Sequence, residues 1–357
     1  MRVGAANPAL LLLAFASLAA AQESAPRFEF RSSLAVIEDA TLYSNLRVPA
    51  PGTLNQILIE PSMSARYRRR VTVSTSLVGM TDTYGDTHAQ GRVKEAYAGL
   101  SAGDFDFTVG RRMVRWGTGY AFTAAGVLDP PRIPTNPTDR LNLNQGRDLV
   151  KADYVHGLNA FSLAWSSAAL APAHANLRDT TAFRYNVLVK GFDTSLIAGD
   201  DRGGDAFGAM TFTRVLGQSW EIHGEAAWRE QGALLAGAKY TTGSGVTFIA
   251  EFYAPPNIPY FRDMSIAPLA GRQHYLFLDA QKNRLRELPG WKEWDLSAYM
   301  VANLDDRSFT VIGDANRRFG NHFSAYLHIE IPRGGKSSDY GAAPYSAATS
   351  AGVRFQL

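Results

Sequence analysis

Apolar residues recur at every second position along most of the chain, in runs of about 9 to 12 residues that turn residues interrupt. Alternation of this kind places successive side chains on opposite faces of a β-strand. Each run is about as long as the 9 to 11 residues that a tilted membrane-spanning strand needs. The clearest runs are residues 28–37, 71–79, 183–189, 220–228, 294–300 and 323–331.

One face of these runs is apolar and the other is polar. From Trp220 to Trp228, for example, the apolar positions alternate with Glu221, His223 and Glu225. A soluble β-sandwich also alternates, but its strands average about 5 or 6 residues. Strands about twice that length, often with Trp or Tyr near their ends, favour a membrane barrel with aromatic girdles. Aromatic residues make up 11% of the chain, which agrees with that reading.

The connections between these runs alternate between short and long, as in bacterial outer-membrane barrels. We therefore predict a transmembrane antiparallel up-and-down β-barrel of about 18 strands, or 16 if residues 274–281 form a loop. Two long-side connections, residues 230–232 and 304–307, are short and break the pattern. Examples of short connections are residues 101–104, 190–191 and 319–321, and long ones are residues 39–56, 116–148 and 332–347.

The N-terminal segment has the features of a secretory signal peptide. Arg2 precedes an apolar run at residues 10–16, and small residues follow as far as Ala21. We predict a signal peptide at residues 1–21 and a single barrel domain at residues 22–357. The apolar run is too short for a bilayer, which takes about 20 residues, and no later stretch reaches that length. Since only helices and closed barrels satisfy their backbone groups in lipid, a barrel in the bacterial outer membrane is expected.

The chain ends inside a strand pattern, with Val353, Phe355 and Leu357 on one face and Arg354 and Gln356 on the other. This end resembles the C-terminal signature of outer-membrane barrels, whose last strand closes on the first. Such barrels usually end in an aromatic residue, and Leu357 holds that place here. The resemblance implies that the barrel assembly machinery, together with membrane lipid, is a partner.

Charge and cysteine content exclude several other classes of protein. The chain has 36 Lys and Arg against 33 Asp and Glu, and removal of Arg2 with the signal peptide leaves 35 basic residues. This balance is too even to suggest a nucleic-acid partner. The chain has no cysteine, so neither a disulfide framework nor a Cys-ligated metal is available. We expect no cofactor and no metal.

The segment from Trp116 to Arg147 is long for a connection and rich in Arg, Pro and Gly. Connections longer than about 12 to 15 residues without alternation tend to be functional or disordered. A barrel of 16 or 18 strands encloses an aqueous hole, and a loop after the fifth strand that folds into the pore would narrow it. A loop lying over the barrel mouth, with solvated arginines, is the alternative. The candidate constriction residues are Arg112, Arg115, Arg132, Asp139 and Arg140.

This segment carries a resemblance to outer-membrane porins of the alginate-export and related groups. In these proteins a strand reading G-R/K-x-x-x-x-W-G runs into a loop with D-P or N-P, and the third external loop of general porins constricts the lumen. The resemblance implies a porin-like channel for passive diffusion of small hydrophilic solutes. The clustered arginines keep open a channel or exporter restricted to an acidic sugar or another anion. The matching residues are Gly110, Arg111, Trp116, Gly117, Asp129 and Pro130.

The polar strand faces supply a wall of mixed charge, which argues against strong charge selection by the barrel itself. An outer-membrane barrel hydrolase is the alternative from another class, because several Ser and His residues lie on these faces. The chain has no metal motif of the form H-E-x-x-H, and scattered histidines are more often hydrated wall residues. We therefore expect no enzymatic activity. The candidate pore-wall residues are Lys151, Asp153, Arg184, Glu221, His223, Glu225 and Arg229.

Overall fold

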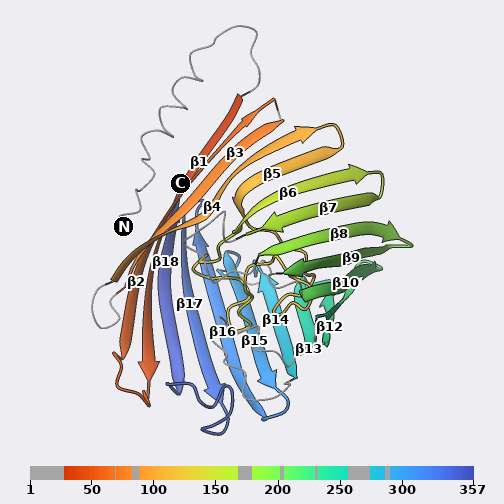
Figure 1. The fold of residues 1–357 in the computed structure, drawn as a ribbon. Helices are drawn as coiled ribbons and strands as arrows, with labels where there is room; N and C mark the ends of the chain where they lie inside the picture. The colour runs from red at the N-terminus through yellow and green to blue at the C-terminus, as the bar shows by residue number, and fades with distance from the viewer. Residues whose placement is uncertain are drawn as a thin grey trace, which may run out of the picture.

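The computed structural model describes residues 28–68, 70–82, 88–167, 179–201, 205–229, 232–255, 274–285 and 290–357. In these residues eighteen strands form one sheet in which each strand pairs with its neighbours in sequence (Figure 1). The expected signal peptide, residues 1–21, lies outside the described residues. Within them, no helix is long and apolar enough to cross a bilayer.

The strand bounds confirm the count of 18, including the strand at residues 275–283 that the sequence left open. The strands are β1 (Phe28–Ser44), β2 (Thr53–Tyr67), β3 (Val71–Asp82), β4 (His88–Ala102), β5 (Phe105–Arg112), β6 (Arg147–His156), β7 (Asn159–Ser166), β8 (Thr180–Val189), β9 (Phe192–Asp201), β10 (Asp205–Leu216), β11 (Trp220–Trp228), β12 (Gly232–Thr241), β13 (Val246–Ala254), β14 (Tyr275–Asn283), β15 (Trp294–Asn303), β16 (Ser308–Phe319), β17 (Phe323–Arg333) and β18 (Ala347–Gln356).

The sheet closes on itself because β1 pairs antiparallel with both β2 and β18. The β1–β18 register runs from Ala35 opposite Gln356 to Ser44 opposite Ala347. Closure gives every described strand two partners, so no edge strand is left with unpaired backbone groups. The last strand therefore joins the first, as the C-terminal pattern indicates.

The two faces of the barrel differ as the alternation predicts. On β6, Val150 points outward and is 43% exposed, whereas its neighbour Leu149 is fully buried. On β17, Leu327 is 42% exposed and the neighbouring His328 points inward and is buried. Large apolar side chains thus cover the outside of the barrel, where a membrane would meet them.

Short turns lie at one end of the barrel, here called the turn end, and long connections at the other, the loop end. The β8–β9 turn has only Lys190 and Gly191, and both have positive φ, at 51° and 80°. Two positive φ values in a two-residue hairpin suit the right-handed twist of the strands, and glycine adopts one at no steric cost. The arginine-rich connection between β5 and β6 lies at the loop end with most of the long connections, whereas the ten-residue connection between β14 and β15, residues 284–293, lies at the turn end.

An arginine placed on the outer face should be costly in proportion to its depth in the membrane. We expect Leu327→Arg, on a central part of β17, to destabilise the folded barrel by about 2–4 kcal/mol. Val187 lies two residues from the turn end of β8, so Val187→Arg should cost less. Urea titration of the lipid-embedded protein measures both, with Leu327→Met as the size-matched control. If Leu327→Arg and Leu327→Met lowered the free energy of unfolding equally, this face would not meet hydrocarbon.

Candidate functional site: the loop inside the barrel

The connection between β5 and β6, residues 113–146 and here called the inward loop, lies within the barrel. In Figure 1 it is the gold trace surrounded by strands. It contacts inward-facing side chains of widely separated strands: Arg140 pairs with Asp39 of β1, and the Tyr299 hydroxyl of β15 donates to the Thr135 carbonyl oxygen at 3.1 Å. The expectation that this loop folds into the pore is confirmed.

Apolar patches on the inner wall hold the inward loop in place. Near its start, Trp116 and Leu128 are buried against Leu149, Ile197 and Phe207 of the wall. The loop here covers wall positions that would otherwise expose apolar side chains to water. Burial of such side chains stabilises the packed loop by about 25 cal/mol per Å² of apolar surface.

Two further patches receive later parts of the loop. Phe122 stacks on Tyr253 of β13, with ring centroids 4.9 Å apart. Leu141 packs with Ile37 of β1 and Leu58 of β2. The loop is therefore packed against the wall at three separate places around the barrel.

Glu225, on β11, binds the loop backbone through both carboxylate oxygens. Its Oε1 accepts hydrogen bonds from the N–H groups of Thr118 and Gly119, the latter at 2.8 Å. Its Oε2 accepts from the N–H groups of Ala124 and Ala125 at 2.6 and 2.7 Å. Glu225 is buried, so these are charge-assisted bonds in a site shielded from water. One wall carboxylate thus fixes a turn of the loop.

Glu251, on β13, binds the adjoining part of the loop. Its oxygens accept hydrogen bonds from the N–H groups of Tyr120, Ala121 and Phe122. His223 Nε2 lies 2.9 Å from Glu251 Oε1, and both side chains are fully buried. His223 therefore supports the carboxylate that holds the loop, beneath the loop itself.

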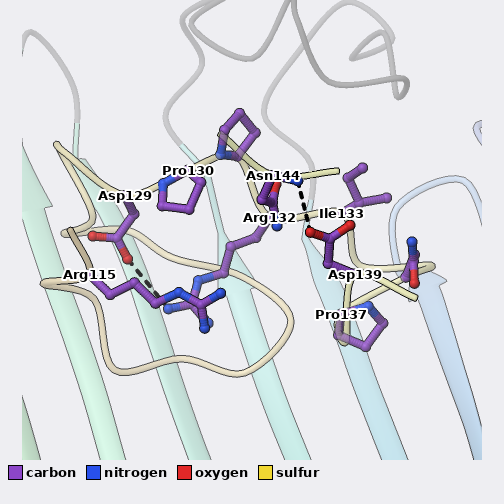
Figure 2. Close-up of a pocket in the computed structure, with 10 residues that line it drawn as sticks. Arg115, Asp129, Pro130, Arg132, Ile133, Pro137, Asp139 and Asn144 are labelled. Atoms are coloured by element: carbon purple, nitrogen blue, oxygen red, sulfur yellow. Dashed lines mark hydrogen bonds and ion pairs between the residues drawn. The ribbon is translucent and has the colours of Figure 1, made fainter. Parts of the chain in front are cut away.

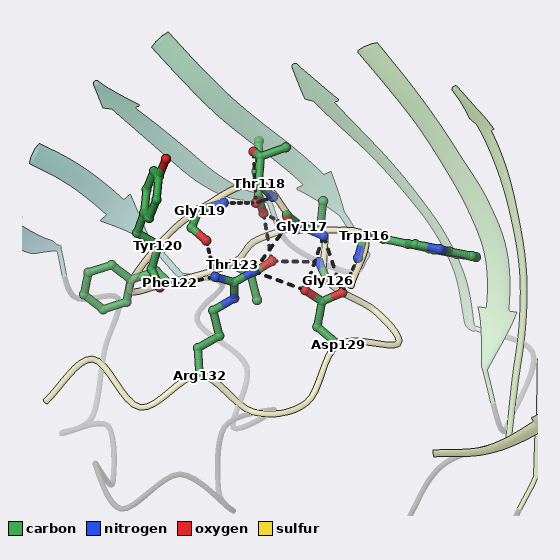
Figure 3. Close-up of polar contacts among 12 residues, drawn as sticks. Trp116, Gly117, Thr118, Gly119, Tyr120, Phe122, Thr123, Gly126, Asp129 and Arg132 are labelled. Carbon is green, nitrogen blue, oxygen red and sulfur yellow. Dashed lines mark hydrogen bonds and ion pairs between the residues drawn. The ribbon is translucent and has the colours of Figure 1, made fainter. Parts of the chain in front are cut away.

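Asp129 and Arg132 fix the loop internally (Figure 3). Asp129 accepts a hydrogen bond from the Trp116 N–H at 2.6 Å, and the Arg132 guanidinium donates to the carbonyl oxygens of Gly119 and Tyr120. Burial raises the pKa of the Asp129 carboxyl, and the hydrogen bond from Trp116 and the charge of Arg132 oppose that rise. The loop is thus an ordered structure with its own internal contacts.

The far part of the loop is tied to β1 and β2. Arg140 Nη1 lies 2.5 Å from Asp39 Oδ2, and the Asn142 amide donates to both oxygens of Glu60, at 2.9 and 2.7 Å. Lys94, almost fully buried, also donates to Glu60 at 2.7 Å. The carboxylates of Asp39 and Glu60 therefore play the same part here as Glu225 and Glu251 on the opposite side.

The five candidate constriction residues lie in or beside the inward loop but differ in their contacts. Arg132 and Arg140 make the bonds described above, and Asp139 accepts from the N–H groups of Leu143 and Asn144 at 2.9 and 2.8 Å. Arg112, on β5, donates to Thr108 Oγ1 at 2.8 Å, with its guanidinium over the Tyr97 ring. Arg115 is exposed.

Arg115 and Arg132 line one small pocket in the loop, shown in Figure 2 together with Asp129, Asp139 and Asn144. The pocket has a volume of about 20 Å³, which is enough for one water-sized group. It is too small for a sugar. The exposed Arg115 lines this pocket beside Asp129 and Arg132, which fix the loop internally.

The candidate wall residues lie in three different settings. Lys151 pairs with Asp153 on β6, Arg184 Nε of β8 donates to Ser195 Oγ at 2.9 Å, and Glu221 accepts from the Tyr120 hydroxyl at 2.8 Å. These side chains are partly exposed to the lumen. His223 and Glu225 lie beneath the loop instead. Arg229 is half-buried and follows β11 at the loop end.

Partly exposed charges of both signs lie on the inner wall, and several are paired, such as Lys151 with Asp153 and Arg318 with Asp295. Three of the basic side chains, here called the basic group, lie on β5, β6 and β8, and three acidic ones, the acidic group, lie on β14, β16 and β17, on the opposite side of the 18-stranded barrel. A solute in the lumen would pass between them. The basic group is Arg112, Lys151 and Arg184, and the acidic group is Asp279, Asp314 and Glu330.

Asp39, Glu60 and Lys94 are not among the residues predicted from the sequence. The alternation predicts a first strand that ends near residue 37, whereas β1 continues to Ser44 because both β2 and β18 pair with it there. Asp39 thereby becomes an inward-facing strand residue. The alternation continues through Asp39, Thr41 and Tyr43, and this pattern could have shown that the first strand extends beyond residue 37.

Comparison with known proteins yields structures rather than relatives in sequence. No protein-family model matches the chain, and no curated protein matches it. Similar solved structures include Pseudomonas aeruginosa OccK5 (OpdH), with a TM-score of 0.61 at 9% identity over 92% of this chain and 98% of that one. P. aeruginosa OccK11 (OpdR) gives a TM-score of 0.63 at 11% identity, over 92% and 96%.

A triple mutant of the Rhodopseudomonas blastica porin gives a TM-score of 0.53 at 10% identity, over 92% of this chain and 100% of that one. The barrel has the fold of bacterial outer-membrane porins. At these identities the likeness concerns the fold.

Proposed function

We propose that this protein is an outer-membrane channel for passive diffusion of small hydrophilic solutes, narrowed by its inward loop. The observation that carries the proposal is the loop itself, which two wall carboxylates, Glu225 and Glu251, fix inside a barrel wide enough for an aqueous pore. In this proposal the turn end faces the periplasm and the loop end faces outward. Lipid, small solutes and the barrel assembly machinery, acting on β18, are the partners.

A channel restricted to anions, such as an acidic sugar, is the second candidate. It is supported by the exposed Arg115 on the loop and by the basic group formed by Arg112, Lys151 and Arg184. Charges in a narrow pore act on a solute more strongly than the same charges at an open mouth. The acidic group across the lumen favours a weak preference over strict selection.

A hydrolase is disfavoured by the setting of the one serine motif that matches an esterase pattern. Residues 99–103 read G-L-S-A-G, the spacing of a nucleophile elbow, which requires a sharp turn from a strand into a helix. Here Ser101 is the last but one residue of β4, the next element is the strand β5, and the Ser101 hydroxyl donates to Asp106. We propose a channel without a catalytic step.

Planar-bilayer recording of the refolded protein tests the proposal. We expect stepwise, ohmic conductance in salt, and swelling of protein-containing liposomes in small sugars. Heat-modifiable migration on a denaturing gel identifies the folded barrel, and heat-unfolded protein is the control. A folded, inserted protein that conducts no ions would refute the channel.

A further inference from the structure

The outer face of β14–β17 has an open apolar groove with a volume of about 410 Å³. Its floor is formed by small outward-facing residues, Ala280, Ala298, Gly313 and Ala315, and Leu327 and Ile329 stand at its side. This volume lies within the range of about 300–1,000 Å³ of ligand sites. The groove faces away from the lumen and is separate from the pore.

The strand register creates the groove. Ala280 lies opposite Ala298, Ala298 opposite Gly313, and Gly313 opposite Ile329. Three small residues therefore stand side by side across three strands. A Cβ added at Gly313 would meet no atom within 4 Å. On other strands, large exposed side chains such as Leu163 of β7 and Met210 of β10 project from the outer face.

The groove runs toward the turn end, where basic residues gather. Val246, the first residue of β13, and Lys282, the last but one of β14, both line it there. Arg317 stands two residues beyond Ala315 on the same face of β16, with its guanidinium 5.6 Å from the Trp294 ring centroid. Arg284 and Lys292 are exposed in the adjoining connection, together with Glu293. Among the residues that the structure describes at this end, basic side chains therefore outnumber acidic ones on the outer surface.

We propose that the groove binds an anionic glycerophospholipid of the periplasmic leaflet, with one acyl chain along the small residues and the phosphate at Lys282 and Arg317. An acyl chain packs closely where side chains are short, because dispersion requires near contact. A cationic side chain near the surface attracts an anionic headgroup. The proposal rests on the outer-membrane location proposed above and is independent of conduction.

Native mass spectrometry of the detergent-purified, refolded barrel tests this with added phosphatidylglycerol and phosphatidylcholine. We expect one phosphatidylglycerol to remain bound in preference to phosphatidylcholine. Gly313→Leu with Ala315→Leu should fill the groove and weaken binding roughly tenfold, as the loss of contact with about two methylene groups would. Gly208→Leu, on the outer face of β10, is the matched control, since a Cβ there also meets nothing within 4 Å.

Lys282→Gln with Arg317→Gln should abolish the preference for phosphatidylglycerol and leave binding of the two lipids similar. If the Gly313→Leu, Ala315→Leu variant and the Gly208→Leu variant retained phosphatidylglycerol equally, the proposal would be overturned. It would also be overturned if the wild-type barrel formed a dimer and only the Gly313→Leu, Ala315→Leu variant did not. Heat-modifiable migration verifies folding of each variant. A conducting barrel without lipid preference would refute the lipid site alone, and a folded, lipid-binding barrel without conductance would refute the channel alone.

Discussion

Replacement of Glu225 and Glu251 together by alanine is expected to release the inward loop and to raise the single-channel conductance. The two carboxylates accept hydrogen bonds from seven backbone N–H groups of the loop, at residues 118–122, 124 and 125. A buried donor left without its partner costs about 1–3 kcal/mol. The packed loop would thus lose several kcal/mol, which its apolar contacts alone do not replace.

Single-channel recording measures the effect as larger and noisier current steps. Deletion of residues 121–136 should enlarge the conductance further, because it removes the central part of the loop. Glu221→Ala with Asp279→Ala is the matched control: it also removes two inward-facing carboxylates, and Glu221 contacts the loop through the Tyr120 hydroxyl alone among the described contacts. Wild-type conductance in the deletion variant would show that the loop does not limit the pore.

Neutralising Arg115 should lower the anion preference of the channel with little change in conductance. Arg115 is exposed on the inward loop, whereas Arg132 donates to carbonyl oxygens of the same loop. Arg115→Gln therefore removes a charge from the pore, and Arg132→Gln removes a support of the loop. We expect Arg132→Gln to resemble partial loop release, with increased current noise.

Reversal potentials in a salt gradient measure the change for Arg115→Gln. The effect should be largest near 0.01 M salt, where the screening length is about 30 Å, and small near 1 M, where it is about 3 Å. Arg31→Gln, at the turn end of β1, is the control because Arg31 lies far along the strand from the loop end. An unchanged reversal potential at low salt would place Arg115 outside the conduction path.

The fold could be predicted from the sequence because a barrel repeats one simple rule. Period-two alternation gave the faces of β11 and β17, and connection lengths gave the order of turn end and loop end. Weak alternation at residues 274–281 did not decide between a strand and a loop, and pairing with β13 and β15 makes this segment the strand β14. Such pairing depends on residues distant in the chain and has no local signal.

The position of the inward loop was predictable only in outline. Its length and its arginines indicated a constriction, but its attachment depends on contacts across 100 or more residues, such as Glu225 with Ala125. Alternation places Glu225 and His223 on the inner wall without showing what covers them. The roles of Arg132 and Arg140 as donors within the loop likewise follow from folded geometry. Arg115 was as prominent in sequence as these two and is the one left exposed.

The attachment of the loop to β1 and β2 on one side and to β11, β13 and β15 on the other has a mechanical consequence. A wide barrel held only by strand pairing can flatten into an ellipse, because its hydrogen bonds bend easily without breaking. A packed segment that joins opposite walls acts as an internal brace, so lateral pressure from the bilayer must also deform the Arg140–Asp39 and Glu225 contacts. The cross-section of the pore should therefore stay nearly constant when membrane tension changes.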